Sequence, residues 1–331
     1  MKKFMNGAGT LAQDCLDGLV AAHGDIVVFG ADRKHVRRRT LRAGKVAIIS
    51  GGGAGHEPMH TGFVGLGMLD AACTGYVFTS PTPDQIVSAI HETDTGSGTL
   101  LIVKNYDGDV MNFEMAAEMA MADGARRIET VIVSDDIAVE RSTRGTGRRG
   151  VAGTLVVEKI VGAAAEAGIS LAELKTLGDT VVGTTRTMGV ALRGTTVPQT
   201  TRETFVLGPD EMEIGVGIHG EPGRARAQLG EASSIVTLIC DQILNDFGGL
   251  SGQSILLFVN GLGGTPLSEL YLVFGLARTF LEAHGVTISR SLVGTYVTSL
   301  DMAGVSITVT VLDDRLMELW DAPVQTASLR W

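Results

Sequence analysis

Short apolar runs rich in β-branched side chains recur along the first half of the chain, and they predict buried strands. These runs are residues 26–29, 46–50, 71–78, 99–103 and 128–133. Segments with apolar residues at helical spacing lie between and after the runs, and they predict helices. These segments are residues 9–23, 57–65, 84–92, 110–122, 151–166 and 171–187. Strands that alternate with helices indicate a mostly parallel sheet with right-handed crossovers.

The second half of the chain has longer apolar runs. Its predicted strands are residues 211–218, 254–259, 286–297 and 305–312, and its predicted helices are residues 230–246, 266–283 and 314–320. The last two strands are compatible with an antiparallel pair, and the strand order stays open. Residues 193–208 have no helical periodicity, and we interpret them as a linker.

The length of 331 residues exceeds the size at which a single core stops growing, about 250–300 residues. We therefore expect an α/β protein of two domains. Residues 1–190 would form an N-terminal domain with a mostly parallel sheet and flanking helices. Residues 191–331 would form a smaller C-terminal α/β domain.

Composition narrows the classes of partner and compartment. The net charge of −10 argues against nucleic acid and anionic membrane as partners. The three cysteines are widely separated, which fits neither a disulfide framework nor a zinc site and favours a reducing compartment. We see no signal peptide and no apolar stretch of about 18 residues that could span a bilayer. We expect a cytoplasmic protein.

A glycine-rich segment directly follows the predicted strand 46–50. Its sequence is Gly51-Gly52-Gly53-Ala54-Gly55, followed by His56-Glu57-Pro58. Glycines tolerate unusual backbone angles and let a ligand approach bare backbone, and α/β proteins bind ligands where a strand passes into a helix. A plain tight turn into a helix is the alternative. The titratable His56 favours a binding site.

Other polar residues at strand ends are candidates for the same site. Lys104 ends a predicted strand, and Asp109 lies five residues further on. Each has a plain alternative, because Lys104 could be a surface side chain and Asp109 could cap a helix. His219 is flanked by glycines, which would expose its imidazole, although a lone histidine is more often structural. Residues 260–265 fit either a phosphate-binding nest or a tight turn.

Several short segments match nucleotide-binding motifs but lack the flanking sequence or secondary structure that each motif requires. The G-x-G-x-x-G pattern at residues 145–150 lies too far beyond its preceding strand, and the one at residues 215–220 is followed at once by Pro222-Gly223, which prevent a clean helix start. Asp246-Phe247-Gly248 has no accompanying kinase motifs, and Gly44-Lys45 lacks the following Ser or Thr. We therefore identify no nucleotide site and no metal site in this chain.

Six separated motifs together give a more specific answer. They are residues 50–58, residues 78–83, residues 101–109, residues 147–150, residues 211–223 and residues 262–266. In this order the motifs resemble the dihydroxyacetone-binding (K) subunit family of dihydroxyacetone kinase, over about residues 10–325. The resemblance implies a two-domain α/β fold and a homodimer.

The resemblance also implies a mechanism. The ketose substrate would lie at Gly53, Ala54, Gly55, His56, Lys104 and Asp109. His219 would hold its carbonyl carbon covalently as a hemiaminal, which selects ketones over alcohols such as glycerol by reactivity. Asp109 would act as base on the terminal hydroxyl, with His56 sharing the proton transfer or donating a hydrogen bond.

In the same family, ADP or ATP with Mg²⁺ is bound by a separate L subunit or by a fused L domain. Because this chain ends at Trp331, we expect the phosphoryl donor to come from a partner L subunit. In one branch of the family a phosphocarrier of the phosphotransferase system rephosphorylates ADP on L, and in another branch ATP is exchanged. The sequence does not distinguish them.

The chain departs from the family pattern at Ala54, Asp107 and Gly261. These departures leave open a larger ketose such as erythrulose. They also leave open a ketose-sensing paralogue that binds a transcription factor. Retention of Asp109 and His56 favours the enzyme, because a sensor needs only the hemiaminal histidine.

Overall fold

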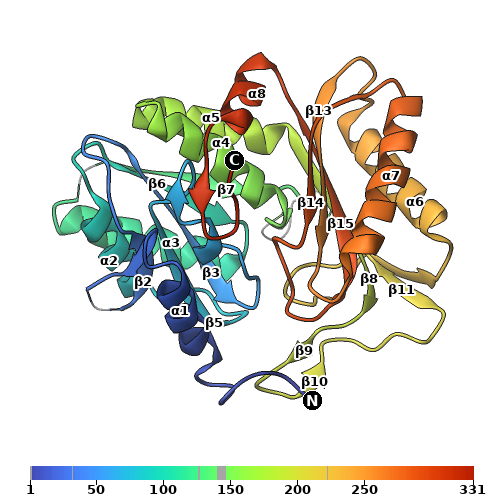
Figure 1. The fold of residues 1–331 in the computed structure, drawn as a ribbon, viewed down its shortest axis with the longest axis horizontal. Helices are drawn as coiled ribbons and strands as arrows, with labels where there is room; N and C mark the ends of the chain where they lie inside the picture. Colours follow the sequence, from blue (N-terminus) through green and yellow to red (C-terminus); the bar gives the residue numbers. More distant parts are fainter. Residues whose placement is uncertain (1, 32, 126, 140–146, 222) are drawn as a thin grey trace. The chain divides into compact units, whose positions relative to one another are not determined.

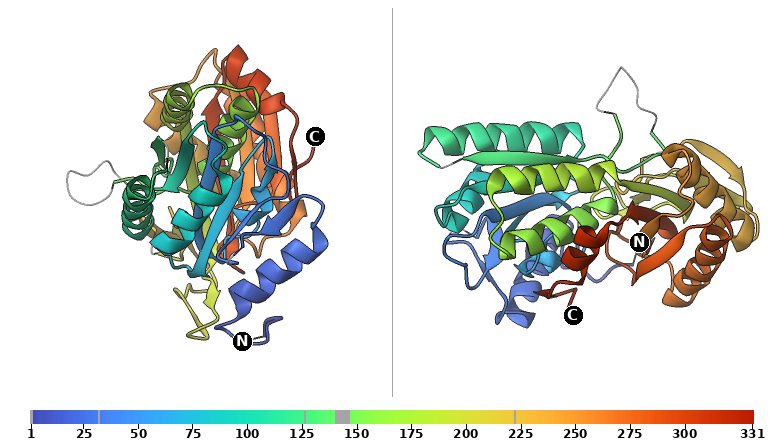
Figure 2. Two further views of the ribbon diagram at one scale, coloured as in Figure 1. Left: turned by 90° about the vertical axis from the view of Figure 1, so that its left-hand side faces the viewer. Right: turned by 90° about the horizontal axis from the view of Figure 1, so that it is seen from above.

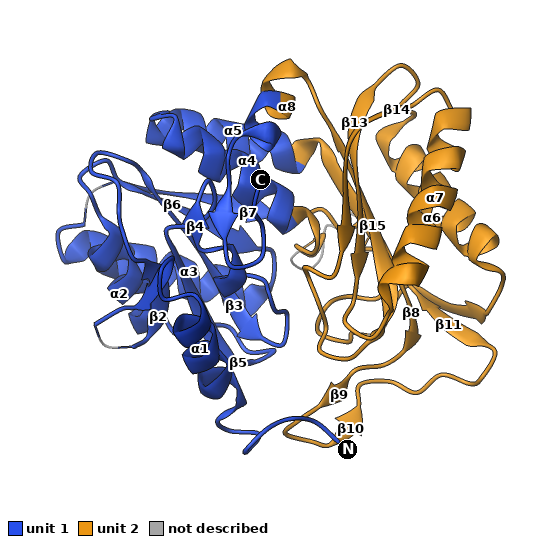
Figure 3. Ribbon diagram, in the orientation of Figure 1, with its two compact units in different colours: residues 1–133, 154–182, 318–331 blue, residues 134–153, 183–317 orange. Residues whose placement is uncertain are grey.

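A computed structural model describes residues 2–31, 33–125, 127–139, 147–221 and 223–331. The chain forms two compact units (Figure 3). Unit 1 comprises residues 1–133, 154–182 and 318–331, and unit 2 comprises residues 134–153 and 183–317. The chain thus passes between the units several times, whereas the sequence suggested one boundary between residues 190 and 191.

Unit 1 contains a six-stranded sheet in the order β1-β2-β5-β3-β6-β7 (Figure 1). The strands are β1 (Val27–Phe29), β2 (His35–Arg38), β3 (Ala47–Ala54), β5 (Ala71–Val77), β6 (Thr99–Lys104) and β7 (Ile128–Val133). Strands β5, β3, β6 and β7 run parallel, and β1 and β2 add an antiparallel edge. The predicted α/β class and the mostly parallel N-terminal sheet are confirmed.

Helices cover both faces of this sheet (Figures 1 and 2). The helices are α1 (Leu11–Ala22), α2 (Pro83–Thr93), α3 (Asp107–Ala122), α4 (Gly153–Glu166) and α5 (Leu171–Gly183). Helices α2 and α3 share a core with the strands that includes Ile49, Leu101 and Phe113. Helix α4 is buried along almost its whole length, as its apolar sequence requires.

Unit 2 contains a second six-stranded sheet, in the order β12-β11-β8-β15-β13-β14. The strands are β8 (Thr185–Arg193), β11 (Glu211–Ile214), β12 (Ala225–Gln228), β13 (Ser254–Gly261), β14 (Thr287–Gly294) and β15 (Ala303–Val311). Only β13 and β14 run parallel. Both β14 and β15 pair with β13, so the two closing strands do not pair with each other. Helices α6 (Ala232–Phe247) and α7 (Leu267–Ala283) pack on this sheet around a shared core.

Short elements complete both units. They are the 3₁₀ helix η1 (Thr61–Phe63), helix α8 (Asp314–Asp321), and strands β4 (Gly65–Leu66), β9 (Thr196–Val197), β10 (Arg202–Glu203) and β16 (Gln325–Thr326). Residues 193–208, interpreted as a linker, lie inside unit 2, where Asp301 accepts hydrogen bonds from the Thr195 hydroxyl and the Thr196 N–H. The linker interpretation is wrong.

Three local predictions also fail. Gly51 to Ala54 do not form a turn, because they continue β3 and pair with β5. The predicted helix 57–65 is a series of turns with the short η1, and Gly65, with a φ of +156°, leaves the helical conformation and starts β4. The predicted helix 171–187 ends at Gly183, and Thr185 starts β8 beside β15.

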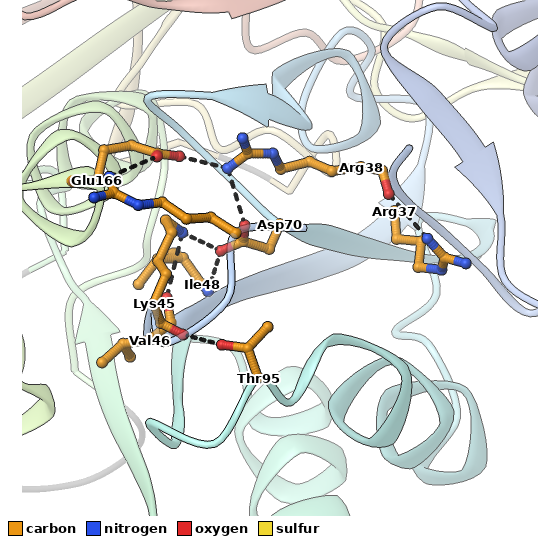
Figure 4. A network of polar contacts seen from close by, with 9 residues as sticks. Arg37, Arg38, Lys45, Val46, Ile48, Asp70, Thr95 and Glu166 are labelled. Carbon is orange, nitrogen blue, oxygen red and sulfur yellow. Dashed lines mark hydrogen bonds and ion pairs between the residues drawn. The ribbon is translucent and has the colours of Figure 1, made fainter. Parts of the chain in front are cut away.

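A buried polar network joins β2, β3 and α4 in unit 1 (Figure 4). Asp70 accepts hydrogen bonds from Lys45, from Arg38 and from the Ile48 N–H. Arg38 also contacts Glu166 at the end of α4. Arg37 and Arg38 lie in β2, and Arg38 is buried by its two carboxylate partners.

Within the described residues, no helix is both long enough and apolar enough to cross a membrane.

Candidate functional site

The glycines of β3 allow close contacts that any side chain would prevent. A Cβ atom at Gly53 would lie 2.5 Å from the Thr79 nitrogen and 2.8 Å from the Phe78 Cα. A Cβ atom at Gly52 would overlap the Lys104 ammonium. The glycine-rich motif is therefore a strand whose missing side chains make room for a lysine on one face and a loop on the other.

Lys104 and Asp109 form a buried ion pair at the carboxyl end of β6. Lys104 is the last residue of β6, and Asp109 lies in the first turn of α3. The Nζ atom of Lys104 lies 3.1 Å from Asp109 Oδ2, and the two side chains are 0% and 3% exposed. The surface alternative for Lys104 is wrong. The N-cap of α3 is Tyr106, so Asp109 does not cap this helix.

A second layer of polar side chains lies behind this pair. Lys104 Nζ is 3.1 Å from His60 Nε2, and His60 Nδ1 is 2.6 Å from Glu158 Oε1. The sequence motifs single out neither His60 nor Glu158. A single acidic residue on an otherwise apolar face of the helix 151–166 was the available signal.

His56 is fully buried. Its ring stacks on Phe78, with centroids 5.2 Å apart and an interplanar angle of 26°. The adjacent Glu57 carboxylate accepts hydrogen bonds from the Gly55 N–H, and burial raises the pKa of Glu57. Phe78 therefore contacts both residues, because its ring stacks on His56 and its backbone packs against Gly53.

His219 lies in unit 2, in the loop after β11. Its backbone N–H donates to Glu221 Oε2 at 3.0 Å, and its Nδ1 lies 3.2 Å from Glu221 Oε1. Burial opposes ionisation of Glu221, but the hydrogen bond and charge of His219, together with Arg149, hold the pKa of Glu221 below its usual value. Glu221 thus fixes the orientation of the imidazole, a role the sequence did not indicate.

Arg149 braces the loop that carries His219. Its guanidinium donates to Asp136 Oδ2 at 2.8 Å through Nε and to the Gly215 carbonyl at 2.8 Å through Nη2. A Cβ atom at Gly217 would lie 2.7 Å from Arg149 Nη1. The glycines around His219 therefore admit the arginine beneath the loop.

Two comparisons identify the family. Residues 17–328 match the family model of the Dak1 domain. The chain is 49% identical over 327 residues to the PTS-dependent dihydroxyacetone kinase 1, dihydroxyacetone-binding subunit DhaK of Listeria innocua, and the alignment covers 98% of this chain and 99% of that protein. The chain belongs to the Dak1 domain family. The family predicted from the six motifs is thus confirmed.

Two solved structures show how this Dak1 chain compares in three dimensions. The dihydroxyacetone kinase of C. freundii in complex with AMP-PNP and Mg²⁺ superposes with a TM-score of 0.88 at 35% identity, over 99% of this chain and 61% of that one. A dihydroxyacetone kinase operon co-activator, Dha-DhaQ, superposes with a TM-score of 0.88 at 33% identity, over 95% of this chain and 96% of that one. The fold alone does not separate the two kinds of relative.

The remaining motifs of the Dak1 chain have structural roles. The N–H groups of Leu262 and Gly264 donate to the carbonyl groups of Gly304 and Met302, which favours a tight connection over a phosphate nest for residues 260–265. Asp246 of the kinase-like tripeptide pairs with Arg148 and Arg186. Residues 145 and 146 of the first G-x-G-x-x-G pattern and Pro222 after the second lie outside the described residues. No cluster of three or more potential metal ligands occurs among the residues that are described.

Proposed function

We propose that this chain is the dihydroxyacetone-binding subunit of a dihydroxyacetone kinase. It would hold the ketose on His219 while the terminal hydroxyl accepts a phosphoryl group from a nucleotide on a separate L subunit. The observation that carries the proposal is the buried Asp109–Lys104 pair beside the glycine strand. It supplies a carboxylate base with a fixed counter-charge at the edge where α/β proteins bind small ligands.

His219 is suited to nucleophilic addition. When Nδ1–H donates to Glu221, the neutral ring has its lone pair on Nε2. Nε2 attacks the ketone carbon, the C–N bond forms, and the carbonyl π electrons move to the oxygen, which takes a proton from solvent. The ring becomes an imidazolium whose Nδ1–H faces the Glu221 carboxylate, which stabilises the positive charge. An alcohol such as glycerol offers no carbonyl carbon for this step.

Asp109 is suited to the proton transfer that accompanies phosphorylation. It would take the proton of the terminal hydroxyl while that oxygen attacks the phosphorus and the bond from phosphorus to the nucleoside diphosphate breaks. The Lys104 ammonium lies 3.1 Å from Asp109 Oδ2 and holds the carboxylate in one position. His56, held by Phe78, would donate a hydrogen bond to the substrate, and Gly53 to Gly55 would line its site.

The phosphoryl donor would be bound elsewhere. The C. freundii kinase, whose structure contains AMP-PNP and Mg²⁺, is longer than the part that this chain covers. That relationship supports ADP or ATP with Mg²⁺ on a partner L subunit. The name of the Listeria relative supports a phosphotransferase-system phosphocarrier that acts through L. We further propose that this chain forms a homodimer.

The co-activator relative supports a second candidate, a ketose sensor that binds a transcription factor. A sensor would form the covalent adduct but would need neither a buried base nor its counter-charge. The buried Asp109–Lys104 pair therefore favours the kinase. A tetrulose such as erythrulose would react in the same way as a triose and remains an alternative substrate.

Reconstitution with the L subunit of a related dihydroxyacetone kinase tests the proposal. The wild-type chain, Asp109→Asn and Asp107→Asn are each assayed for ketose phosphate, with dihydroxyacetone or erythrulose and with each donor. We expect Asp109→Asn to lower turnover about 10²- to 10⁴-fold, because a general base is lost. The matched control Asp107→Asn alters an exposed carboxylate two residues away and should keep turnover close to that of wild type. Wild-type protein that forms the adduct but phosphorylates neither ketose with either donor would refute the kinase and favour the sensor.

A further inference from the structure

The Lys104 ammonium has all three of its hydrogen-bond donors engaged inside unit 1. Its Nζ lies 3.1 Å from the Gly51 carbonyl oxygen, 3.1 Å from His60 Nε2 and 3.1 Å from Asp109 Oδ2. An ammonium group has three N–H donors and no acceptor. Each of the three neighbours must therefore accept a hydrogen bond, and His60 Nε2 must carry a lone pair.

This requirement fixes the tautomer of His60. Burial, assisted by the charges of Lys104 and His56, lowers the pKa of His60 well below its usual value, so the ring is neutral. A neutral ring that accepts at Nε2 carries its proton on Nδ1. Nδ1 faces Glu158 Oε1 at 2.6 Å and Ser50 Oγ at 3.0 Å. The Ser50 hydroxyl donates its proton to the Ile102 carbonyl, so it can only accept from Nδ1–H.

We propose that His60 and Glu158 are positioning residues for phosphoryl transfer: Glu158 holds His60 in the Nδ1–H tautomer, and His60 in turn holds Lys104 against Asp109. The four side chains form one buried chain, Asp109–Lys104–His60–Glu158, in which His60 and Glu158 would not touch substrate. The inference deepens the proposed function and rests on it for the role of Asp109.

Glu158 acts in this chain as a hydrogen-bond acceptor and does not need a negative charge. Burial raises the pKa of Glu158 to about 8, although the charge of Lys104 opposes this shift. With a proton on Oε2, Glu158 still accepts from His60 through Oε1. The neutral amide of glutamine has the same acceptor in the same place, whereas leucine has similar bulk and no acceptor. The pair Glu158→Gln and Glu158→Leu therefore separates hydrogen bonding from packing.

Loss of the Glu158 acceptor would affect Asp109 indirectly, through the His60–Lys104 and Lys104–Asp109 contacts. Without Glu158 Oε1, the His60 proton can move to Nε2, where it would face the N–H donors of Lys104. Two donors repel each other, so the ammonium must move away from His60 and alter its contact with Asp109. The base would then lose its fixed counter-charge, which lowers kcat, whereas ketose binding on His219 in unit 2 would be unaffected.

The tautomer can be measured directly. The chain has 7 histidines, so ¹⁵N labelling of histidine gives few imidazole signals, and His60→Gln identifies that of His60. We expect wild type and Glu158→Gln to show a neutral Nδ1–H ring between pH 6 and 8. Glu158→Leu should lose this tautomer and lower kcat roughly 10- to 100-fold with little change in KM. A loss of this size is typical when the hydrogen-bond partner of a metal ligand is removed. The matched control Glu166→Gln alters another carboxylate of α4 and should change neither the tautomer nor kcat.

Three results would overturn the inference. They are an Nε2–H or charged His60 in wild type, an unchanged kcat in folded Glu158→Leu, and an equal loss of kcat in Glu158→Gln. If Glu158→Leu does not fold, the wild-type tautomer and the Glu158→Gln kinetics decide. The tautomer is observed without substrate, so an Nδ1–H ring in a protein that turns over no ketose would refute the proposed function and leave the hydrogen-bonded chain intact.

Discussion

Gly53→Ala is a sharp perturbation of the glycine strand, because the new Cβ would meet backbone atoms. It would lie 2.5 Å from the Thr79 nitrogen, 2.8 Å from the Phe78 Cα and 2.9 Å from the Phe78 carbonyl carbon. Ordinary contact begins at 3.4 Å, so β3 and the segment at 78–79 must separate by about 0.9 Å. Neither can yield by a side-chain rotation, because the clash lies in the backbone.

The displacement should cost both stability and activity. Overpacking of this kind destabilises by about 1–3 kcal/mol, which lowers Tm by roughly 2–12 °C in a unit of this size. Phe78 also positions His56 through their stacked rings, 5.2 Å apart. A misplacement of about 1 Å at a reacting centre can cost on the order of 100-fold, so we expect a loss of that order in kcat/KM for the ketose.

Calorimetry and the reconstituted kinase assay measure the two effects. Gly189→Ala in β8 is the matched control, because its Cβ would meet its nearest neighbour at 3.4 Å. We expect the control to change the free energy of unfolding by less than about 1 kcal/mol and to leave activity unchanged. A Gly53→Ala variant with the Tm and kcat/KM of wild type would refute the close packing of β3 against residues 78–79.

Three further predictions concern other parts of the chain. Asp70→Asn removes the carboxylate shared by buried Lys45 and Arg38 and should lower the free energy of unfolding in urea by about 3–5 kcal/mol. The control Asp84→Asn removes an exposed ion pair with Lys34 and should lower it by at most about 1 kcal/mol, so equal losses in the two variants would contradict the prediction. Burial raises the pKa of Glu158 from 4.5 to about 8, so between these values the folded chain holds a proton that the unfolded chain has released, and stability should fall with rising pH in wild type more steeply than in Glu158→Gln. Parallel stability curves of the two proteins over that range would count against the raised pKa. Glu221→Gln should weaken ketose affinity roughly 10- to 100-fold in calorimetric titration, because the imidazolium adduct loses a charged hydrogen-bond partner; an unchanged affinity would show that Glu221 does not stabilise the adduct.

Periodicity in the sequence predicted most elements because it reports burial directly. The runs at 99–103 and 128–133 became β6 and β7, and the apolar segment 151–166 became the buried helix α4. The glycine run was assigned to a turn because local preference says little about pairing. Gly51 to Ala54 stay extended because their backbone groups bond to β5, and no local pattern encodes that partner.

The site residues that lie in sequence motifs could be predicted, whereas those brought together only by tertiary contacts could not. Lys104 ends β6 and Asp109 lies in the first turn of the next helix, so the two side chains meet at the carboxyl end of the strand, where α/β proteins bind ligands. The contact between His60 and Glu158 joins residues 98 positions apart. A burial pattern cannot specify such a pair, so the tautomer of His60 could be derived only from the structure.

The proposed function depends most on the covalent bond between His219 and the ketose. Protein labelled with ¹⁵N at histidine, mixed with dihydroxyacetone labelled with ¹³C at its carbonyl carbon, tests it directly, because a new C–N bond gives a one-bond ¹³C–¹⁵N coupling. We expect this coupling at Nε2 of His219, its absence in His219→Ala, and its retention in His91→Ala, which alters a half-exposed histidine of α2. A saturated wild-type sample without any ¹³C–¹⁵N coupling, with dihydroxyacetone or with labelled erythrulose, would contradict the account.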